Sequence, residues 1–253
     1  MNHLFFTHHH FDHDVDYPCF LLCRWDQGAG KEKPLVVRGP HLTERVTRRI
    51  LDAEQGAFGH DWVARVNAPL SQRVHTQRGG VLPRRPPSVD VRDIGPGVVF
   101  SGKDWQVTAA PAEHVQPWLD SLAYRIDTPD GSIVITGDTQ PCNSIVELAR
   151  DADVLVCMCC DDEQDCPECE LPGRTGTIGA ARMAQQAGAR TLVLTHVGPQ
   201  LANNLALENA RGAIRHIYDG RVVLAEELQL LDVAQLPAGS EVGMRQAWRQ
   251  TGR

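Results

Sequence analysis

Near its amino end the chain carries a histidine cluster, Thr7-His8-His9-His10-Phe11-Asp12-His13, which fits the pattern His-x-His-x-Asp-His. In an extended segment, residues two apart point the same way, so His8 and His10 can face one cation. Asp12 and His13, slightly further along, can face a second cation beside the first. Imidazole and carboxylate ligands together suit zinc, with iron and manganese as alternatives. The cluster therefore predicts a site for two divalent metal ions.

A purification-tag remnant or a histidine-rich loop would also explain several histidines in a row. A tag would be a longer, uninterrupted run, whereas here Leu4-Phe5-Phe6 predicts a buried strand that leads directly into the cluster. We therefore favour the metal site.

The composition is that of an ordinary globular protein, with 253 residues, 42% hydrophobic and 23% charged, and a net charge of −7. No long basic run is present, which argues against a protein that tracks a nucleic-acid backbone. The absence of an apolar run of about 18 residues and of a signal-like segment predicts a cytoplasmic protein with no membrane partner. Eight cysteines without regular spacing fit a reducing compartment.

The order of predicted elements indicates an α/β protein. Periodicity predicts strands at residues 4–7 and 34–37, helices at 15–25 and 41–54, and no regular element over the glycine- and proline-rich residues 56–97. Hairpins are expected at 98–109 and 122–136, and helices and buried strands then alternate at 143–150, 154–156, 177–187, 191–195, 203–217 and 221–224. We expect sheets covered by helices in one domain, residues 1–233, followed by a flexible tail, residues 234–253.

Three further residues of ligand type stand where predicted strands end, which is where α/β proteins assemble their sites. His114 follows the strand at 105–109, Asp138 follows that at 133–136, and His196 follows that at 191–195. Taken singly, they are better explained as a surface histidine, a turn residue and a helix-capping partner. Together with the histidine cluster they predict the remainder of a dinuclear centre.

These residues resemble the metallo-β-lactamase superfamily and, within it, the ribonuclease Z-like branch. The resemblance rests on four strings: residues 7–13, Pro117-Trp118-Leu119-Asp120-Ser121-Leu122-Ala123-Tyr124-Arg125-Ile126, Thr136-Gly137-Asp138-Thr139 and Leu194-Thr195-His196-Val197-Gly198-Pro199. It implies a layered αββα sandwich. It also implies that His8, His10 and His114 hold one metal, that Asp12, His13 and His196 hold the other, and that Asp138 bridges them.

This arrangement implies a hydrolase in which a metal-bridging hydroxide attacks a small ester, lactone or phosphodiester. Asp12 and Asp138 are then catalytic as well as ligating. The chain departs from the ribonuclease Z pattern where a Glu and a His assist the leaving group, because these positions fall on Met158 and near Arg174 or Thr175. A tRNA 3′-processing endonuclease, with RNA as its partner, is therefore less favoured than a small-molecule hydrolase, and a non-catalytic metal-binding relative is a third alternative.

A second departure lies at the start of the chain. Family members place the histidine motif after a block of strands, and here almost nothing precedes it. We therefore expect missing or truncated N-terminal strands, an exposed sheet edge at residues 4–7 and, as a consequence, low solubility or a homo-oligomer.

The segment Cys157-Met158-Cys159-Cys160-Asp161-Asp162-Glu163-Gln164-Asp165-Cys166-Pro167-Glu168-Cys169 is rich in cysteine and carboxylates. Cys166-x-x-Cys169 has zinc-ligand spacing and, with Cys157 or Cys160, would close a structural metal site. We favour the alternative that Cys157 and Cys159 are small core residues at a strand end. Asp161 and Asp162 are candidates for the general acid, and Glu163 and Arg174 for substrate contact, although solvated loop charges explain all four equally well.

Overall fold

The computed structural model describes residues 1–29, 33–160, 172–201 and 204–235. The chain divides into two units. The first comprises Met1–Val99, Thr108–Pro111 and Val115–Leu122, and the second comprises Phe100–Val107, Ala112–His114 and Ala123–Arg253. The division into a domain over residues 1–233 and a tail over 234–253 stays a prediction, and residues 236–253 lie outside the described part of the chain.

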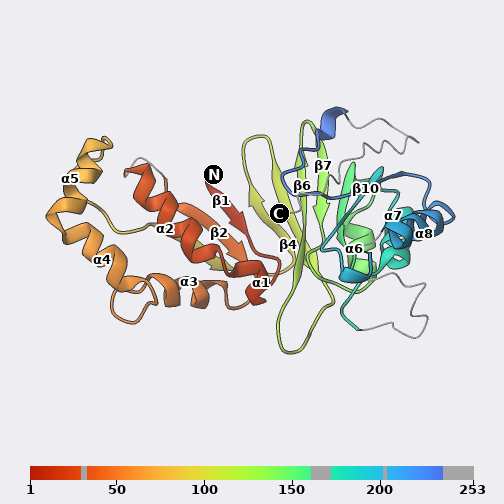
Figure 1. Cartoon of the computed structure of the whole chain (residues 1–253), viewed down its shortest axis with the longest axis horizontal. Helices are drawn as coiled ribbons and strands as arrows, with labels where there is room; N and C mark the ends of the chain where they lie inside the picture. The colour runs from red at the N-terminus through yellow and green to blue at the C-terminus, as the bar shows by residue number, and fades with distance from the viewer. Residues whose placement is uncertain (30–32, 161–171, 202–203, 236–253) are drawn as a thin grey trace. The chain divides into compact units, whose positions relative to one another are not determined.

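A parallel three-stranded sheet forms the centre of the first unit, in the order β1 (His3–Phe5), β2 (Leu35–Gly39) and β3 (Val89–Asp93) (Figure 1). Parallel neighbours need crossover connections, and helices supply them. Between β1 and β2 lie α1 (Phe11–Asp14) and α2 (Tyr17–Gly28). Between β2 and β3 lie α3 (Thr43–Leu51), α4 (Gly59–Asn67) and α5 (Pro69–Gln77).

One apolar core joins the strand before the histidine motif to the helix after it. Tyr17 and Leu21, the buried residues of α2, pack in one cluster with Phe6 and with Leu35 and Val37 of β2. Burial raises the pKa of Tyr17 to about 12, and its hydroxyl keeps a hydrogen-bond partner, the Thr47 hydroxyl, at 2.8 Å. This core holds both ends of the histidine motif in place.

A seven-stranded sheet, ordered β10-β9-β8-β7-β6-β5-β4, supplies most of the second unit (Figure 1). Its strands are β4 (Gly97–Ser101), β5 (Gln106–Pro111), β6 (Leu122–Thr128), β7 (Gly131–Ile135), β8 (Val154–Met158), β9 (Thr191–Thr195) and β10 (Arg221–Leu224). Strands β6 and β7 are antiparallel, and β7, β8, β9 and β10 run parallel.

The helices of the second unit are α6 (Asn143–Leu148), α7 (Thr177–Ala187) and α8 (Asn204–Arg215), with 3-10 turns at Pro199–Leu201 and Val233–Gln235. Helix α7 contacts β8, β9, α6 and α8. It buries small residues, among them Ala180, Ala181 and Ala184, which let helix and sheet approach closely. Among the described residues, none of the helices has both the length and the apolar character of a membrane span.

Most predicted elements are confirmed, and the bounds of α7, β9 and β10 agree to the residue. The prediction fails over residues 56–97, which contain α4, α5 and β3. The physical reason is that both helices are short and bury little, α4 only Gly59 and α5 only His75, so their apolar periodicity is too brief to stand out among the glycines and prolines around them. Strand β1 lies at the edge of its sheet, and the missing N-terminal strands and the homo-oligomer stay predictions.

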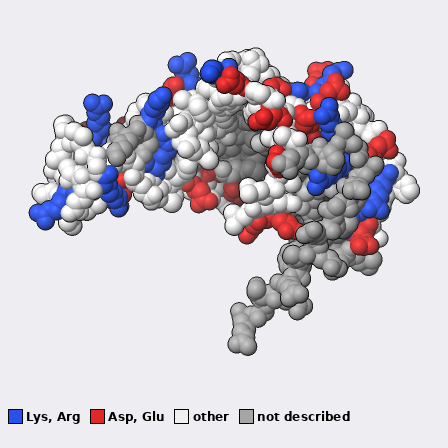
Figure 2. Space-filling model, turned by 90° about the horizontal axis from the view of Figure 1, so that it is seen from above, with Lys and Arg blue, Asp and Glu red and all other residues white. Residues whose placement is uncertain are grey.

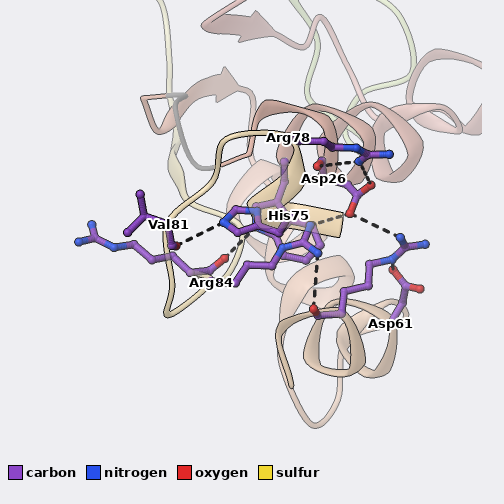
Figure 3. Close-up of polar contacts among 9 residues, drawn as sticks. Asp26, Asp61, His75, Arg78, Val81 and Arg84 are labelled. Carbon is purple, nitrogen blue, oxygen red and sulfur yellow. Dashed lines mark hydrogen bonds and ion pairs between the residues drawn. The ribbon is translucent and has the colours of Figure 1, made fainter. Parts of the chain in front are cut away.

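An ionic cluster ties the chain after α5 to α2 (Figure 3). Asp26 accepts hydrogen bonds from Arg84 at 2.6 Å and Arg78 at 3.1 Å, and Arg65 lies 3.5 Å away. Burial raises the pKa of Asp26, but the hydrogen bonds from Arg84 and Arg78 outweigh it and hold the pKa below its ordinary value. The Arg84 guanidinium also stacks 4.2 Å from the Trp25 ring. These contacts fix the proline-rich residues 83–87.

Candidate metal centre

The first unit contains the four predicted ligands of the histidine motif, here called the amino-terminal half-site: His8, His10, Asp12 and His13. His8 is fully buried, and its Nε2 lies 3.2 Å from Nδ1 of His10. Two imidazole nitrogens on one tetrahedral zinc ion stand about 3.3 Å apart, given zinc–nitrogen distances of about 2.0–2.1 Å. The spacing therefore fits two ligands of one ion.

The local fold separates this pair from the next two ligands. His10 is extended, with φ −75° and ψ 149°, and directly precedes α1, which carries Asp12 and His13. The Asp12 Oδ2 and His13 Nε2 atoms lie 3.6 Å apart. A strand-like step followed by a helical turn thus presents two pairs of candidate ligands in sequence, and their role as metal ligands stays a prediction.

His9 does not join the ligand pairs. Its Nε2 lies 2.8 Å from the Thr43 hydroxyl and its Nδ1 lies 3.2 Å from Asp14. Both ring nitrogens therefore have partners, Nε2 on α3 and Nδ1 on α1, and His9 points away from His8 and His10, in keeping with the alternation expected of extended chain.

The second unit contains the carboxy-terminal half-site: His114, Asp138 and His196. The Asp138 Oδ2 atom lies 3.5 Å from Nε2 of His196 and 3.9 Å from Nε2 of His114. Asp138 is only 6% exposed. A buried carboxylate is costly unless a cation or proton neutralises it, and one oxygen between two imidazoles suits a bridging ligand.

Parallel strands bring these residues together. Asp138 follows β7 and His196 follows β9, and the two strands flank β8 in the same direction, so their carboxyl ends share one edge of the sheet. His196 takes the left-handed conformation, with φ 52°, a strained backbone that is common at functional sites. The three predictions from strand ends are thus brought together within this unit.

Each imidazole of this half-site has a partner on its other nitrogen. The Nδ1 of His114 donates to the carbonyl of Gly173 at 2.7 Å, so a neutral His114 carries its proton on Nδ1 and offers Nε2 as the ligand atom. The Nδ1 of His196 lies 3.6 Å from Sγ of Cys160. The hydrogen bond with Cys160 and the charge of Asp138 outweigh burial and raise the pKa of His196 to about 9. The negative charge of Asp138 can therefore be balanced either by a proton on His196 or by a cation.

The cysteines at the end of β8 belong to the core, as expected. Cys157 and Cys159 are fully buried, and burial raises the pKa of Cys157 to about 12, which keeps its sulfur a neutral thiol. Met158 is also buried, and its sulfur accepts a hydrogen bond from the Thr139 amide at 3.0 Å. No proton donor stands at this position. Arg174 is exposed, and Asp161, Asp162, Glu163, Cys166 and Cys169 lie outside the described residues.

Two residues around His114 were not anticipated from the sequence, Gln140 and Gly173. The Gly173 amide donates to Oε1 of Gln140 at 2.9 Å. In the sequence, the one local signal for them is that Gly173 follows a proline. The role of both residues depends on contacts between distant segments, which local patterns do not predict.

Comparison with known proteins places the chain in a family. The profile described as "Beta-lactamase superfamily domain" matches residues 41–197, more than half of the chain. Ribonuclease Z of Mycobacterium avium (strain 104) is 30% identical over 239 residues, which cover 91% of this chain and 79% of that protein. Ribonuclease Z of Mycobacterium bovis (strain BCG / Pasteur 1173P2) is 28% identical over 236 residues, which cover 90% of this chain and 78% of that protein.

Solved structures agree at the level of the fold. The metallo-beta-lactamase fold protein YhfI from Bacillus subtilis matches with a TM-score of 0.58 at 18% identity, over 89% of this chain and 75% of that chain. Human tRNase Z, short form, matches with a TM-score of 0.55 at 18% identity, over 93% of this chain and 79% of that chain. The chain belongs to the metallo-β-lactamase superfamily, in its ribonuclease Z-like branch.

Proposed function

We propose that the protein is a dinuclear metal-dependent hydrolase that acts on a small ester, lactone or phosphodiester. The observation that carries the proposal is the buried Asp138 carboxylate, whose Oδ2 lies within 4 Å of the Nε2 atoms of both His114 and His196. A carboxylate in that position suits a ligand shared between two cations. The amino-terminal half-site supports the proposal. His8 is buried and His10 is half-buried, and the 3.2 Å between their ring nitrogens suits two ligands of one ion.

In the proposed centre, His8, His10 and His114 hold one ion, Asp12, His13 and His196 hold the other, and Asp138 bridges them. Zinc suits this mixed set of nitrogen and oxygen donors, with iron and manganese as alternatives. When bound, a pair of such ions activates water near neutral pH and polarises the scissile bond. The protein's part is to aim the imidazoles and the Asp138 carboxylate and to supply a proton to the leaving group.

The proton donor and the substrate contacts are proposed to come from the residues between β8 and α7. Asp161 and Asp162 remain the proposed acids, and Glu163 a proposed substrate contact, from the segment that follows β8 in the chain. Arg174 is exposed, so its guanidinium can meet an anionic group of the substrate.

A tRNA 3′-processing endonuclease is the second candidate, because relatives of 28–30% identity bear the name ribonuclease Z. Residues 43–88 add support, since they carry eight arginines against four acidic residues. Figure 2 shows Lys and Arg side chains spread over the helical end of the first unit, with few acidic ones between them. Phosphate backbones bind to such surfaces. Against this candidate stand Met158 and Arg174 or Thr175, which fall where the proton-transfer pair is expected.

Metal analysis followed by a substrate panel tests the proposal. Protein stripped with a chelator and reloaded with zinc, iron or manganese is assayed on an aryl phosphodiester, an aryl ester, a lactone and a precursor tRNA. We expect about two ions per chain and metal-dependent turnover of a small substrate. Turnover of precursor tRNA alone would favour the nuclease, whereas two bound ions with no turnover on any substrate would favour a non-catalytic metal-binding relative. Protein that binds no metal contradicts all three.

A further inference from the structure

A closed ring of hydrogen bonds surrounds His114 within the second unit. His114 Nδ1 donates to the Gly173 carbonyl at 2.7 Å, and the Gly173 amide donates to Oε1 of Gln140 at 2.9 Å. The Gln140 side chain in turn donates from Nε2 to Oε2 of Glu113 at 2.8 Å, and its backbone amide donates to the Glu113 carbonyl at 2.7 Å. Since Glu113 precedes His114 in the chain, the ring returns to its starting point.

Gly173 occupies its place in the ring because it has no side chain. Its φ is +86°, and a Cβ atom at this position would overlap the carbonyl oxygen of His114. The Gly173 peptide therefore lies directly against the His114 backbone while its carbonyl accepts the imidazole proton. One peptide unit thus fixes both the backbone and the ring of the same histidine.

Gln140 is the residue that connects this peptide to the rest of the half-site. It stands two residues after Asp138, on the segment that follows β7, whereas His114 follows β5 and Gly173 precedes α7. A side-chain amide is the group suited to the task, because its oxygen accepts from Gly173 and its nitrogen donates to Glu113. An ionised carboxylate could not donate, and a lysine ammonium could not accept.

We propose that Gln140 is a positioning residue for metal binding: it holds Gly173 so that the His114 imidazole keeps the tautomer and orientation that offer Nε2 beside Asp138. The inference rests on the proposed function, since it concerns one ligand of the proposed centre. Partners in the shell around a metal ligand typically change metal affinity by roughly 10–100-fold when removed.

The test compares Gln140→Ala with a matched control, Gln185→Ala. Gln185 also links two segments of the second unit, donating to the Asp219 carboxylate at 3.2 Å and accepting from the Asp219 amide at 3.1 Å, and it lies on α7 away from the predicted ligands. Zinc affinity is measured by competition with a chelating dye on the full chain. The absorption spectrum of the Co²⁺-loaded protein reports ligand geometry, and thermal unfolding of the metal-free protein reports stability.

We expect Gln140→Ala to weaken zinc binding by roughly 10–100-fold and to change the Co²⁺ spectrum, while Gln185→Ala leaves both unchanged. Gln140→Glu keeps the acceptor for Gly173 and nearly the same volume but replaces the donor to Glu113 by a second carboxylate, so it should also weaken zinc binding. Wild-type zinc affinity in both Gln140 variants overturns the inference, as does an equal loss of affinity in Gln185→Ala. If the wild-type chain binds no zinc, iron or manganese, the proposed function fails instead, and the two failures are thereby told apart.

Discussion

The two half-sites reach a similar chemistry by different routes. The amino-terminal half-site takes all its proposed ligands from residues 8–13, where one extended step and one helical turn are enough to pair them. The carboxy-terminal half-site collects its ligands from positions 114, 138 and 196, and depends on the parallel order of β7, β8 and β9. The first is therefore specified by local sequence, whereas the second exists only when the sheet has formed.

The largest effect is expected from Asp138, the proposed shared ligand. Asp138→Ala should remove both ions and lower kcat/KM by roughly 10³-fold or more, because activation of water depends on the ions. Asp12→Ala, in the amino-terminal half-site, should lose one ion and retain the other. Elemental analysis of metal per chain, together with turnover of the best small substrate, measures the difference.

Asp130→Ala is the matched control, since Asp130 lies in the exposed turn between β6 and β7 of the same unit. It should keep two ions and wild-type turnover. If Asp138→Ala also kept both ions and full activity, the bridging assignment would be wrong and the two half-sites would have to act separately.

The next effect tests how far the carboxy-terminal half-site depends on packing. Gly173→Ala should destabilise the protein by roughly 2–4 kcal/mol, since it combines an unfavourable positive φ with overlap against the His114 carbonyl. Gly95→Ala should change stability by less than about 0.5 kcal/mol, because a Cβ there meets nothing within 4 Å. Urea unfolding of both variants checks the prediction, and equal stabilities would contradict the tight packing around His114.

The same contrast explains what could be predicted from the sequence. His8, His10, Asp12 and His13 follow from spacing alone, and His114, Asp138 and His196 were found because each follows a strand that its apolar run had already predicted. The elements from β6 onwards were predicted for the same reason, because buried strands and alanine-rich helices leave strong patterns.

Other features left no such pattern. Helices α4 and α5 bury little apolar surface. The chain after them is anchored by the buried Arg84, which pairs with Asp26 and stacks on the Trp25 ring. Gln140 acts through a contact with Gly173, more than thirty residues away, which no local rule predicts. Sequence patterns thus indicate candidate ligands and apolar faces, while ionic anchors and hydrogen-bonded supports depend on tertiary contacts.

A smaller effect is expected from the ionic cluster of the first unit. Asp26→Asn should cost roughly 1–3 kcal/mol, because it leaves the nearly buried Arg84 without its charged partner, a penalty reduced here by the partial exposure of Asp26. Asp61→Asn is the matched control, since Asp61 pairs only on the surface with Arg65, one turn away, and should cost about 0.3–0.5 kcal/mol. Equal costs would mean that the cluster does not anchor the first unit.

The smallest effect is the pH dependence of that cluster. The pKa of Asp26 lies below its ordinary value of 3.8 in the folded chain, so the unfolded chain binds more protons as the pH falls past 3.8. The stability that Asp26 contributes is complete above this pH and is lost as the pH falls through the folded pKa. The difference in unfolding free energy between wild type and Asp26→Asn should therefore be constant from pH 6 to about pH 5 and shrink below pH 3.8. Urea titrations across this range measure it. If the difference in unfolding free energy grew on acidification, the predicted sign would be wrong. Arg84 and Trp25 would then anchor the chain without help from the Asp26 carboxylate.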